Sequence, residues 1–236
     1  YQSENLPAEA FWGEVIERLD LAVKIHAGKP ENIPETGPLV VVANHPYGVL
    51  DGIVICWLVA QRRQDFKILI NSVLCRAPEM SGHVLPIDFD PTTEALETNL
   101  QSRRQARDHL DAGGVVIVFP SGAIATTPHM LARQVTEEPW APLAGQLVRR
   151  SRAAVLPVYF AGQNSRLFQM ASHVSYAMRV ALIFHEVRRR MGTNLDLVIG
   201  EAIDFSVLEA HLPAKNLARH LQKHVYGLSR FLRKRA

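Results

Sequence analysis

Short, almost wholly apolar segments alternate with helical segments along most of this chain of 236 residues. Strands with apolar side chains on both faces lie in sheets that are covered on both sides, and helices between consecutive strands make such a sheet largely parallel. The sequence therefore predicts an α/β fold with a mixed, largely parallel central sheet and helices on both faces. The predicted strands are 39–43, 66–70, 115–119, 155–160 and 196–199, and the predicted helices are 8–26, 48–61, 92–112, 141–152, 165–190 and a last one from 213 onward.

One domain spanning residues 1–236 is expected, because a chain of this size with 47% hydrophobic and 21% charged residues can bury a stable core. Residues 1–30 are expected to hold an amphipathic helix, followed by a core over 38–205 and a C-terminal helical segment over 206–236. The chain begins at Tyr1 rather than Met, which is typical of a processed or trimmed piece.

Charge and cysteine content argue against several classes of function. The net charge of +3 is too small to indicate a protein that binds nucleic acid. The two cysteines, Cys56 and Cys75, cannot build a disulfide framework and form no CxxC pair, so a reducing compartment is expected. No segment approaches the ~20 apolar residues that a membrane-spanning helix needs.

Contact with a membrane surface stays open on these criteria. Basic residues cluster at 149–152, 188–190 and 230–235, and such clusters either meet an anionic lipid surface or lie on solvated helix faces. The apolar side chains of the predicted helix 8–26 either lie on a membrane or pack on the core.

Polar residues follow directly on the first predicted strand, in VVVANHPYGVLDG at 40–52. A neutral imidazole at His45 can take a proton from an attacking hydroxyl. The turn that follows can bring Asp51 close enough to orient the ring and stabilise the imidazolium, with Asn44 as a local support. A strand, turn and helix whose polar residues only cap the helix is the alternative interpretation.

A second motif, Phe119-Pro120-Ser121-Gly122, ends the predicted strand 115–119. Ligands bind beyond the carboxyl ends of the strands in such sheets, so both motifs are expected at one edge. Ser121 lacks the flanking glycines of the GxSxG nucleophile turn. Lining a pocket with backbone donors or a polar side chain is therefore the favoured role, and a plain tight turn is the alternative.

Metal and nucleotide sites lack their motifs. HEVRR at 185–189 has Arg189 where the HExxH zinc motif has its second histidine, and the other histidines show no ligand spacing. Neither GxGxxG nor GxxxxGK[ST] is present. We therefore expect no metal and no resident cofactor.

Together the motifs resemble those of the glycerolipid and lysophospholipid acyltransferase (PlsC-like) family, and the resemblance spans residues 38–205. The pairing of NHPxGxxDG with FPSG is similar to the bacterial hemolysin-like branch, whose relatives occur in ornithine-lipid synthesis. Five blocks stand in the family's order: NHPYGVLDG at 44–52, NSVLCRAPEMSGHVLPIDF at 71–89, VVIVFPSGAIATT at 115–127, AAVLPVYFAGQNSRLF at 153–168 and LDLVIGEAIDF at 195–205.

This resemblance implies an O-acyltransferase that moves a fatty acyl group from acyl-CoA or acyl carrier protein to the hydroxyl of a lysophospholipid or lyso-ornithine lipid. His45 would be the general base and Asp51 its partner, within a catalytic core over 38–205. The enzyme would work in the cytoplasm, peripherally on the inner face of the cytoplasmic membrane. The residues expected to bind substrate are Asn44, Arg76, Pro120, Ser121, Gly122, Pro157 and Arg166.

The first block departs from the commonest family pattern in its spacing. Five residues separate His45 from Asp51, where that pattern has four. Gly48 can absorb the extra residue, because glycine tolerates backbone angles that other residues avoid.

The third block departs in its charged residues. It usually reads FPEGTR, and here Ser121 replaces the glutamate while Ile124 stands at the place of the arginine. An acceptor phosphate would lose a guanidinium partner there. Arg76 or Arg166 would then supply the positive charge, or the acceptor carries no phosphate.

Two other functions stay open. The same residues can direct water onto the acyl group, as in a thioesterase or lipase, which would release a fatty acid without any lysolipid. The missing glutamate and arginine of the third block also suit a non-catalytic, membrane-docked protein that only binds lipid.

Overall fold

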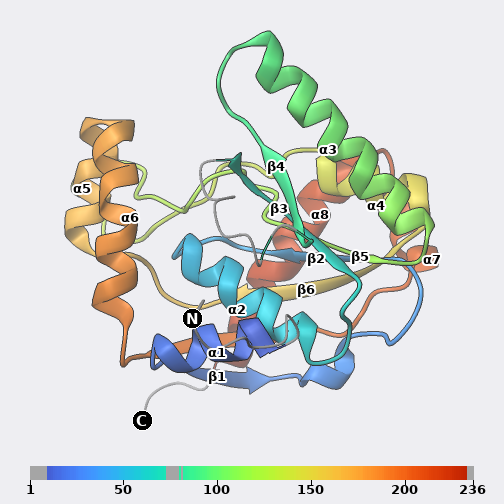
Figure 1. The fold of residues 1–236 in the computed structure, drawn as a ribbon, viewed down its shortest axis with the longest axis horizontal. Helices are drawn as coiled ribbons and strands as arrows, with labels where there is room; N and C mark the ends of the chain where they lie inside the picture. The colour runs from blue at the N-terminus through green and yellow to red at the C-terminus, as the bar shows by residue number, and fades with distance from the viewer. Residues whose placement is uncertain (1–9, 73–79, 81, 233–236) are drawn as a thin grey trace.

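The computed structural model describes residues 10–72, 80 and 82–232 (Figure 1). Its strands are β1 (Ala22–Ala27), β2 (Leu39–Ala43), β3 (Phe66–Asn71), β4 (Val84–Ile87), β5 (Val115–Val118), β6 (Ala154–Phe160) and β7 (Asn194–Ile199). They form one seven-stranded sheet in the order β1-β7-β6-β2-β5-β3-β4. All neighbours pair in parallel except β6 and β7, which are antiparallel. The predicted mixed, largely parallel sheet is confirmed.

Helices cover both faces of this sheet (Figure 1). The α-helices are α1 (Phe11–Arg18), α2 (Val49–Ala60), α3 (Thr93–Asp111), α4 (Leu143–Ser151), α5 (Arg166–Val174), α6 (Tyr176–Arg190), α7 (Phe205–Leu208) and α8 (Ala214–Gly227). Leu39 and Val41 of β2 pack in the apolar cluster that contains α1 and α2, whereas Val40 and Val42 pack in the one that contains α3, α4 and α8. The alternation follows from the two-residue period of a strand.

The predicted helix over 8–26 is wrong in its second half. Helix α1 ends at Arg18, and Ala22–Ala27 form the edge strand β1, which pairs in parallel with β7. Val23 and Ile25 alternate with the polar Lys24 and His26, and this period of two favours a strand where β7 offers an edge.

The apolar face of α1 packs on the core rather than on a membrane. Phe11, Trp12 and Ile16 are at most 9% exposed. The ring of Trp12 lies 5.9 Å from the ring of Phe66 in β3, measured between centroids. Of the two alternatives left open for this helix face, the structure shows packing on the core for these three side chains.

Strand β4 was not predicted from the sequence. Its four residues include Pro86, which cannot donate a ladder hydrogen bond, and β4 accordingly lies at the edge of the sheet. The hydroxyl of Ser102 on α3 donates to the Pro86 carbonyl at 2.6 Å and ties the strand to the helix that follows it.

The predicted helical stretch 165–190 is divided at Ser175 into α5 and α6. The backbone of Ser175 is extended, with φ of −160° and ψ of 139°, and its hydroxyl accepts the N–H of Ala177 at 3.2 Å. The two helices lie side by side as a hairpin next to the sheet (Figure 1). No helix in the described part of the chain combines the length and apolarity needed to span a membrane.

Candidate active site

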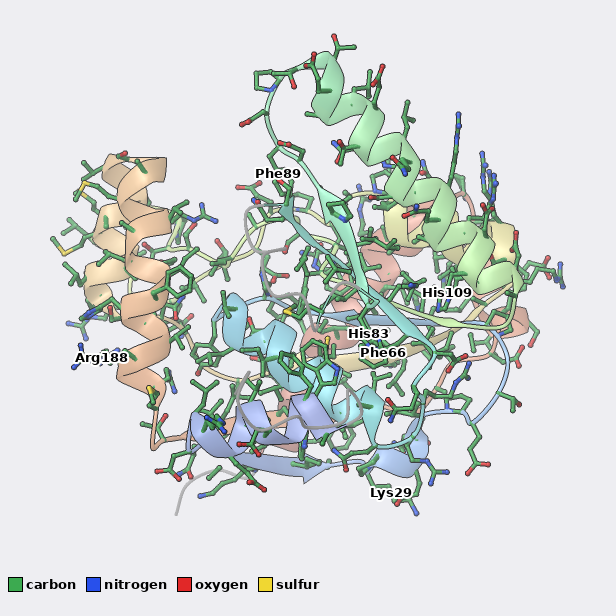
Figure 2. All side chains as sticks on the ribbon, in the orientation of Figure 1. Lys29, Phe66, His83, Phe89, His109 and Arg188 are labelled. Atoms are coloured by element: carbon green, nitrogen blue, oxygen red, sulfur yellow. The ribbon has the colours of Figure 1, made fainter. Side chains whose placement is uncertain are left out.

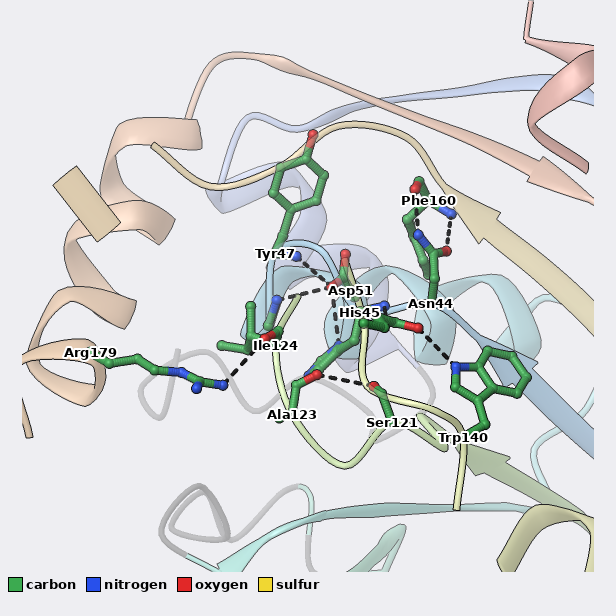
Figure 3. Close-up of polar contacts among 12 residues, drawn as sticks. Asn44, His45, Tyr47, Asp51, Ser121, Ala123, Ile124, Trp140, Phe160 and Arg179 are labelled. Carbon is green, nitrogen blue, oxygen red and sulfur yellow. Dashed lines mark hydrogen bonds and ion pairs between the residues drawn. The ribbon is translucent and has the colours of Figure 1, made fainter. Parts of the chain in front are cut away.

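Asn44 follows β2 and joins the end of that strand to the end of β6. Its Nδ2 atom donates to the Phe160 carbonyl at 2.8 Å, and its Oδ1 atom accepts the Phe160 N–H at 2.7 Å (Figure 3). The side chain is buried. Because both polar atoms of the amide are used, Asn44 sets where the chain leaves the sheet and so positions His45.

His45 and Asp51 are in contact, as the sequence predicted. Nδ1 of His45 lies 3.1 Å from Oδ2 of Asp51, and the imidazole is 18% exposed while the carboxylate is fully buried. The same Oδ2 atom accepts the backbone N–H of Tyr47 at 2.7 Å and of Gly48 at 2.9 Å (Figure 3). The imidazole can therefore reach a substrate, whereas the carboxylate orients it from behind.

Gly48 makes the wider spacing between His45 and Asp51 possible. It is the N-cap of α2 and has φ of +79°, which glycine adopts at little cost. A Cβ atom here would also lie 2.5 Å from Cδ1 of Ile124. The backbone angle fits the predicted role of this glycine, and the close contact to the loop after β5 is a second reason for it.

Burial shapes the ionisation of Asp51. Removal from solvent raises the pKa of this carboxyl, while hydrogen bonding and charge from His45 and the N–H groups of Tyr47 and Gly48 lower it. Oδ1 has no hydrogen-bond partner among the described residues. Ionisation of Asp51 therefore carries a cost in solvation, which its hydrogen-bond partners reduce.

The loop after β5 covers the other side of His45. The ring of Phe119 stacks on the imidazole with 4.1 Å between centroids, and Ala125 donates its N–H to the His45 carbonyl at 2.8 Å. Since β2 and β5 are neighbours and run in parallel, their carboxyl ends bring both motifs to one edge.

The Pro120-Ser121-Gly122 turn follows Phe119 at this edge. Gly122 has φ of +70° and donates its N–H to the Phe119 carbonyl at 3.0 Å. The Ser121 hydroxyl donates to the Ala123 carbonyl at 3.0 Å, so it is engaged within the turn rather than with His45 (Figure 3). This geometry gives no support to Ser121 as a nucleophile.

Glu137 is a site residue that the sequence did not reveal. It accepts the backbone N–H of His45 through Oε1 and the indole N–H of Trp140 through Oε2, the latter at 2.8 Å. Burial raises the pKa of its carboxyl, and the hydrogen bonds from Trp140 and His45 oppose that shift. No local motif marks this glutamate as a site residue, because its partner in the site, His45, lies 92 residues away in the sequence.

A cavity of about 260 Å³ adjoins the site. Its walls come from the loop residues on either side of Thr127, from Glu137, and from His173 and Arg179 of the α5–α6 hairpin. Arg179 donates to the Ile124 carbonyl at 3.3 Å (Figure 3), and His173 lies 3.0 Å from the Thr127 hydroxyl. The guanidinium of Arg179 therefore contacts Ile124, which stands where the commonest family pattern has an arginine.

The remaining predicted binding residues lie elsewhere or outside the described residues. Arg166 donates to the carbonyls of Met130 and Ala132 and so fastens a surface loop. Pro157 is buried inside β6, where a Cβ atom at Gly200 would lie 2.6 Å from its ring. These contacts are structural. Arg76 lies outside the described residues.

The described residues offer neither a metal-binding cluster nor an exposed cysteine. Over residues 10–72, 80 and 82–232, no group of three or more His, Cys, Asp or Glu side chains is arranged to hold a metal ion. Cys56 is buried on α2, and burial raises the pKa of its thiol well above the usual value, so this cysteine is chemically inert.

Comparison with known proteins points in one direction. The model of the Acyltransferase family matches residues 24–161, more than half of the chain. A lyso-glycine lipid O-acyltransferase of Phocaeicola vulgatus is 22% identical over 96% of this chain and 80% of its own length. A protein of the same name from Bacteroides thetaiotaomicron is 22% identical over 88% of this chain and 76% of its own.

A solved structure shares the fold. The 1-acyl-sn-glycerophosphate (LPA) acyltransferase PlsC from Thermotoga maritima superposes with a TM-score of 0.62. The match covers 97% of this chain and 80% of that one, at 17% sequence identity.

Proposed function

The chain belongs to the acyltransferase family, and from this premise we propose that it transfers a fatty acyl group from acyl-CoA or acyl carrier protein to the hydroxyl of a lysolipid. The observation that carries the proposal is the 3.1 Å contact between Nδ1 of His45 and the buried carboxylate of Asp51. Both curated relatives are named for transfer to a lysolipid, and their matches cover most of the chain.

The proposed reaction needs one proton to move through His45. Nε2 takes the proton of the acceptor hydroxyl as its oxygen attacks the thioester carbonyl, and the C–S bond of the tetrahedral intermediate then breaks with the electron pair going to sulfur. The imidazolium returns the proton to the departing sulfur, which leaves an ester and a free thiol. Asp51 holds Nδ1 and stabilises the positive ring, while Tyr47 and Gly48 fix the carboxylate.

The turn Pro120-Ser121-Gly122 and the adjoining cavity are proposed to hold the acceptor. The turn follows Phe119, whose ring stacks on His45, so a molecule lying on the turn is next to the base. Arg179 brings a guanidinium into the cavity wall, and guanidinium groups pair with carboxylates and phosphates. An anionic head group, such as that of an N-acyl amino acid or a phosphate ester, fits this chemistry.

The proposed substrates also determine where in the cell the protein would work. A lysolipid is held in a membrane, and acyl-CoA or acyl carrier protein is dissolved in the cytoplasm, so the proposal includes a peripheral position on the inner face of the cytoplasmic membrane. The apolar face of α1 is buried and offers no anchor for that position.

The test uses purified protein with labelled acyl-CoA or acyl carrier protein, offered with lyso-glycine lipid, lyso-ornithine lipid, lysophosphatidate or lysophosphatidylcholine. We expect label in a diacylated lipid with the wild type, and its loss with His45→Ala. His129→Ala is the matched control, because His129 is exposed on a surface loop.

Two outcomes contradict the proposal. Label released only as free fatty acid, with or without lysolipid, identifies a hydrolase that uses water. No turnover with any pair, while the protein still binds lipid vesicles, identifies a lipid-binding protein without catalysis.

A further inference from the structure

The α5–α6 hairpin exposes an apolar surface that a helix in a water-soluble domain normally buries. On α5 the exposed fractions are 54% for Leu167, 47% for Met170 and 62% for Val174. On α6 they are 48% for Met178 and 67% for Phe184. Large exposed apolar side chains gathered on one element mark a binding surface, whereas scattered ones need no explanation.

The side of the hairpin that faces the rest of the protein carries polar anchors. Gln169, fully buried, accepts the N–H of Thr127 at 3.0 Å. Arg179 donates to the Ile124 carbonyl at 3.3 Å, whereas Glu186, which is 1% exposed, accepts the N–H of Ser165, the N-cap of α5, and so joins the two helices to each other. Hydrogen bonds thus help to hold the hairpin in place, and its exposed apolar side chains are left for another partner.

Apart from Arg179, whose guanidinium donates to the Ile124 carbonyl, the arginines of the hairpin lie at the end away from its turn. Arg166 begins α5 and the run 188–190 ends α6, whereas Val174 and Met178 flank the turn between the helices. Figure 2 shows Arg188 near the end of α6 that leads back to the sheet. With a rise of 1.5 Å per residue, Arg188 lies about 15 Å from Met178 along the helix axis.

This order of residues matches the cross-section of a lipid leaflet. Apolar side chains near the turn can enter the acyl region, and arginines nearer the sheet then lie at the level of the phosphates. The inner side of the same hairpin contributes His173 and Arg179 to the cavity beside His45. A lipid leaving the bilayer along this hairpin therefore has a short path to the site.

We propose that the outer face of the α5–α6 hairpin docks on an anionic lipid bilayer. The docking face consists of Leu167, Met170, Val174, Met178 and Phe184, with the exposed Arg188 and Arg189 as its cationic border. Arg189 also lies 3.8 Å from the carboxylate of Glu186. The choice of a bilayer as the partner rests on the proposed function, which needs a lipid acceptor, and on the charge complementarity of the arginines to anionic head groups.

Flotation with vesicles of phosphatidylethanolamine and phosphatidylglycerol tests the docking face. We expect the wild type to float, and a Val174→Ser, Met178→Ser, Phe184→Ser triple variant to bind at least about tenfold less. Leu96→Ser combined with Leu100→Ser is the matched control, since these side chains are 57% and 43% exposed on α3. The control is expected to bind like the wild type.

The arginine border has its own test. Arg188→Gln combined with Arg189→Gln is expected to weaken binding to vesicles that contain phosphatidylglycerol and to leave the weak binding to pure phosphatidylcholine unchanged. An equal loss on both kinds of vesicle would contradict the assigned role of these arginines.

Three results would overturn the docking face. The wild type would not float; or the α3 control would lose binding as strongly as the hairpin variant; or light scattering would show a dimer that the triple variant abolishes, without vesicle binding. The last result would assign the face to a second copy of the chain.

The test separates this inference from the proposed function. His45→Ala is expected to float like the wild type while it transfers no acyl group. The triple hairpin variant is expected to keep transfer to lysolipid dispersed in detergent and to lose transfer to lysolipid in vesicles. Absence of transfer in a wild type that floats would overturn the function alone.

Discussion

The backbone N–H of His45 donates to the carboxylate of Glu137, which lies 92 residues further along the chain. This hydrogen bond holds the turn after β2 from outside, while Asn44 holds it from the sheet and Asp51 from α2. Three separate parts of the chain therefore fix the position of one imidazole. Such fixation keeps the base in a reactive geometry without rearrangement during the reaction.

Replacement of Glu137 by glutamine is expected to lower activity through His45. The two carboxylate oxygens accept from two different donors, so an amide satisfies only one of them. A buried donor without a partner costs about 1–3 kcal/mol. We expect kcat to fall about tenfold and the melting temperature to decrease, whereas Glu94→Gln on the exposed side of α3 changes neither. An unchanged kcat in Glu137→Gln would show that this hydrogen bond does not position the base.

Asp51→Asn is expected to lower activity strongly while the fold is kept. The asparagine can still accept the N–H groups of Tyr47 and Gly48, but it cannot stabilise an imidazolium, so kcat should fall about 1,000-fold or more.

The same variant has a predicted pH dependence of stability. Because the pKa of Asp51 is raised by burial, the folded protein binds this proton more tightly than the unfolded chain does. The stabilisation from this group is fully present below the unfolded pKa of 3.8 and is lost as the pH rises through the folded pKa. Urea unfolding from acid to neutral pH should therefore show Asp51→Asn gaining stability relative to the wild type as the pH rises. A relative loss would contradict the raised pKa.

Gly48→Ala is expected to destabilise the protein by about 1–2 kcal/mol, because alanine meets both the φ of +79° and the side chain of Ile124. Adding Ile124→Ala should recover only the part due to the contact. Gly52→Ala is the control within the same helix, since its Cβ atom would have 4.0 Å to the nearest atom and alanine favours a helix. Thermal melting that ranks Gly52→Ala below Gly48→Ala would contradict this explanation.

Asn44→Asp is expected to reduce both stability and activity. The new carboxylate would face the Phe160 carbonyl, which now receives a hydrogen bond from Nδ2. Asn99 offers a comparison, because its amide makes the same pair of hydrogen bonds with the backbone of Asp88, just after β4. Asn99→Asp should cost stability while kcat falls less than in Asn44→Asp, since Asn99 bonds to the chain after β4 and not to the strand end that leads into His45. Equal losses of kcat in the two variants would show that Asn44 acts only on stability.

Arg179→Ala is expected to raise KM for the acceptor about tenfold and to leave KM for the thioester donor unchanged, because the guanidinium lines the cavity beside the site. The acceptor KM of Arg179→Lys should lie between those of the wild type and Arg179→Ala, since lysine keeps the charge and lacks the paired donors of the guanidinium. Arg104→Ala on the exposed side of α3 serves as the control. A rise in KM for the thioester donor instead would show that Arg179 binds the donor and not the acceptor.

The sequence alone predicted the fold class, and it offered the contact between His45 and Asp51 as one of two interpretations of the turn. Apolar strands alternating with helices imply a covered, largely parallel sheet, and a base and a carboxylate on one short turn can hardly avoid each other. The roles of these two residues in catalysis, and those of Pro120, Ser121 and Gly122 in binding, stay predictions. The substrate-binding roles first expected for Pro157 and Arg166 found no geometric support, since Pro157 is buried inside β6 and Arg166 fastens a loop.

Only the tertiary structure revealed Glu137, Arg179 and the exposed face of the hairpin. Periodicity is a local property of the chain, so it tells which residues share a face of a helix, but the surroundings decide whether that face is buried. The wrong prediction for α1 and β1 has the same cause. The apolar residues over 11–25 fit helical spacing, but the second half of this segment pairs with the edge of β7 as a strand. Partners far apart in the sequence meet only because the order of strands in the sheet brings their loops together.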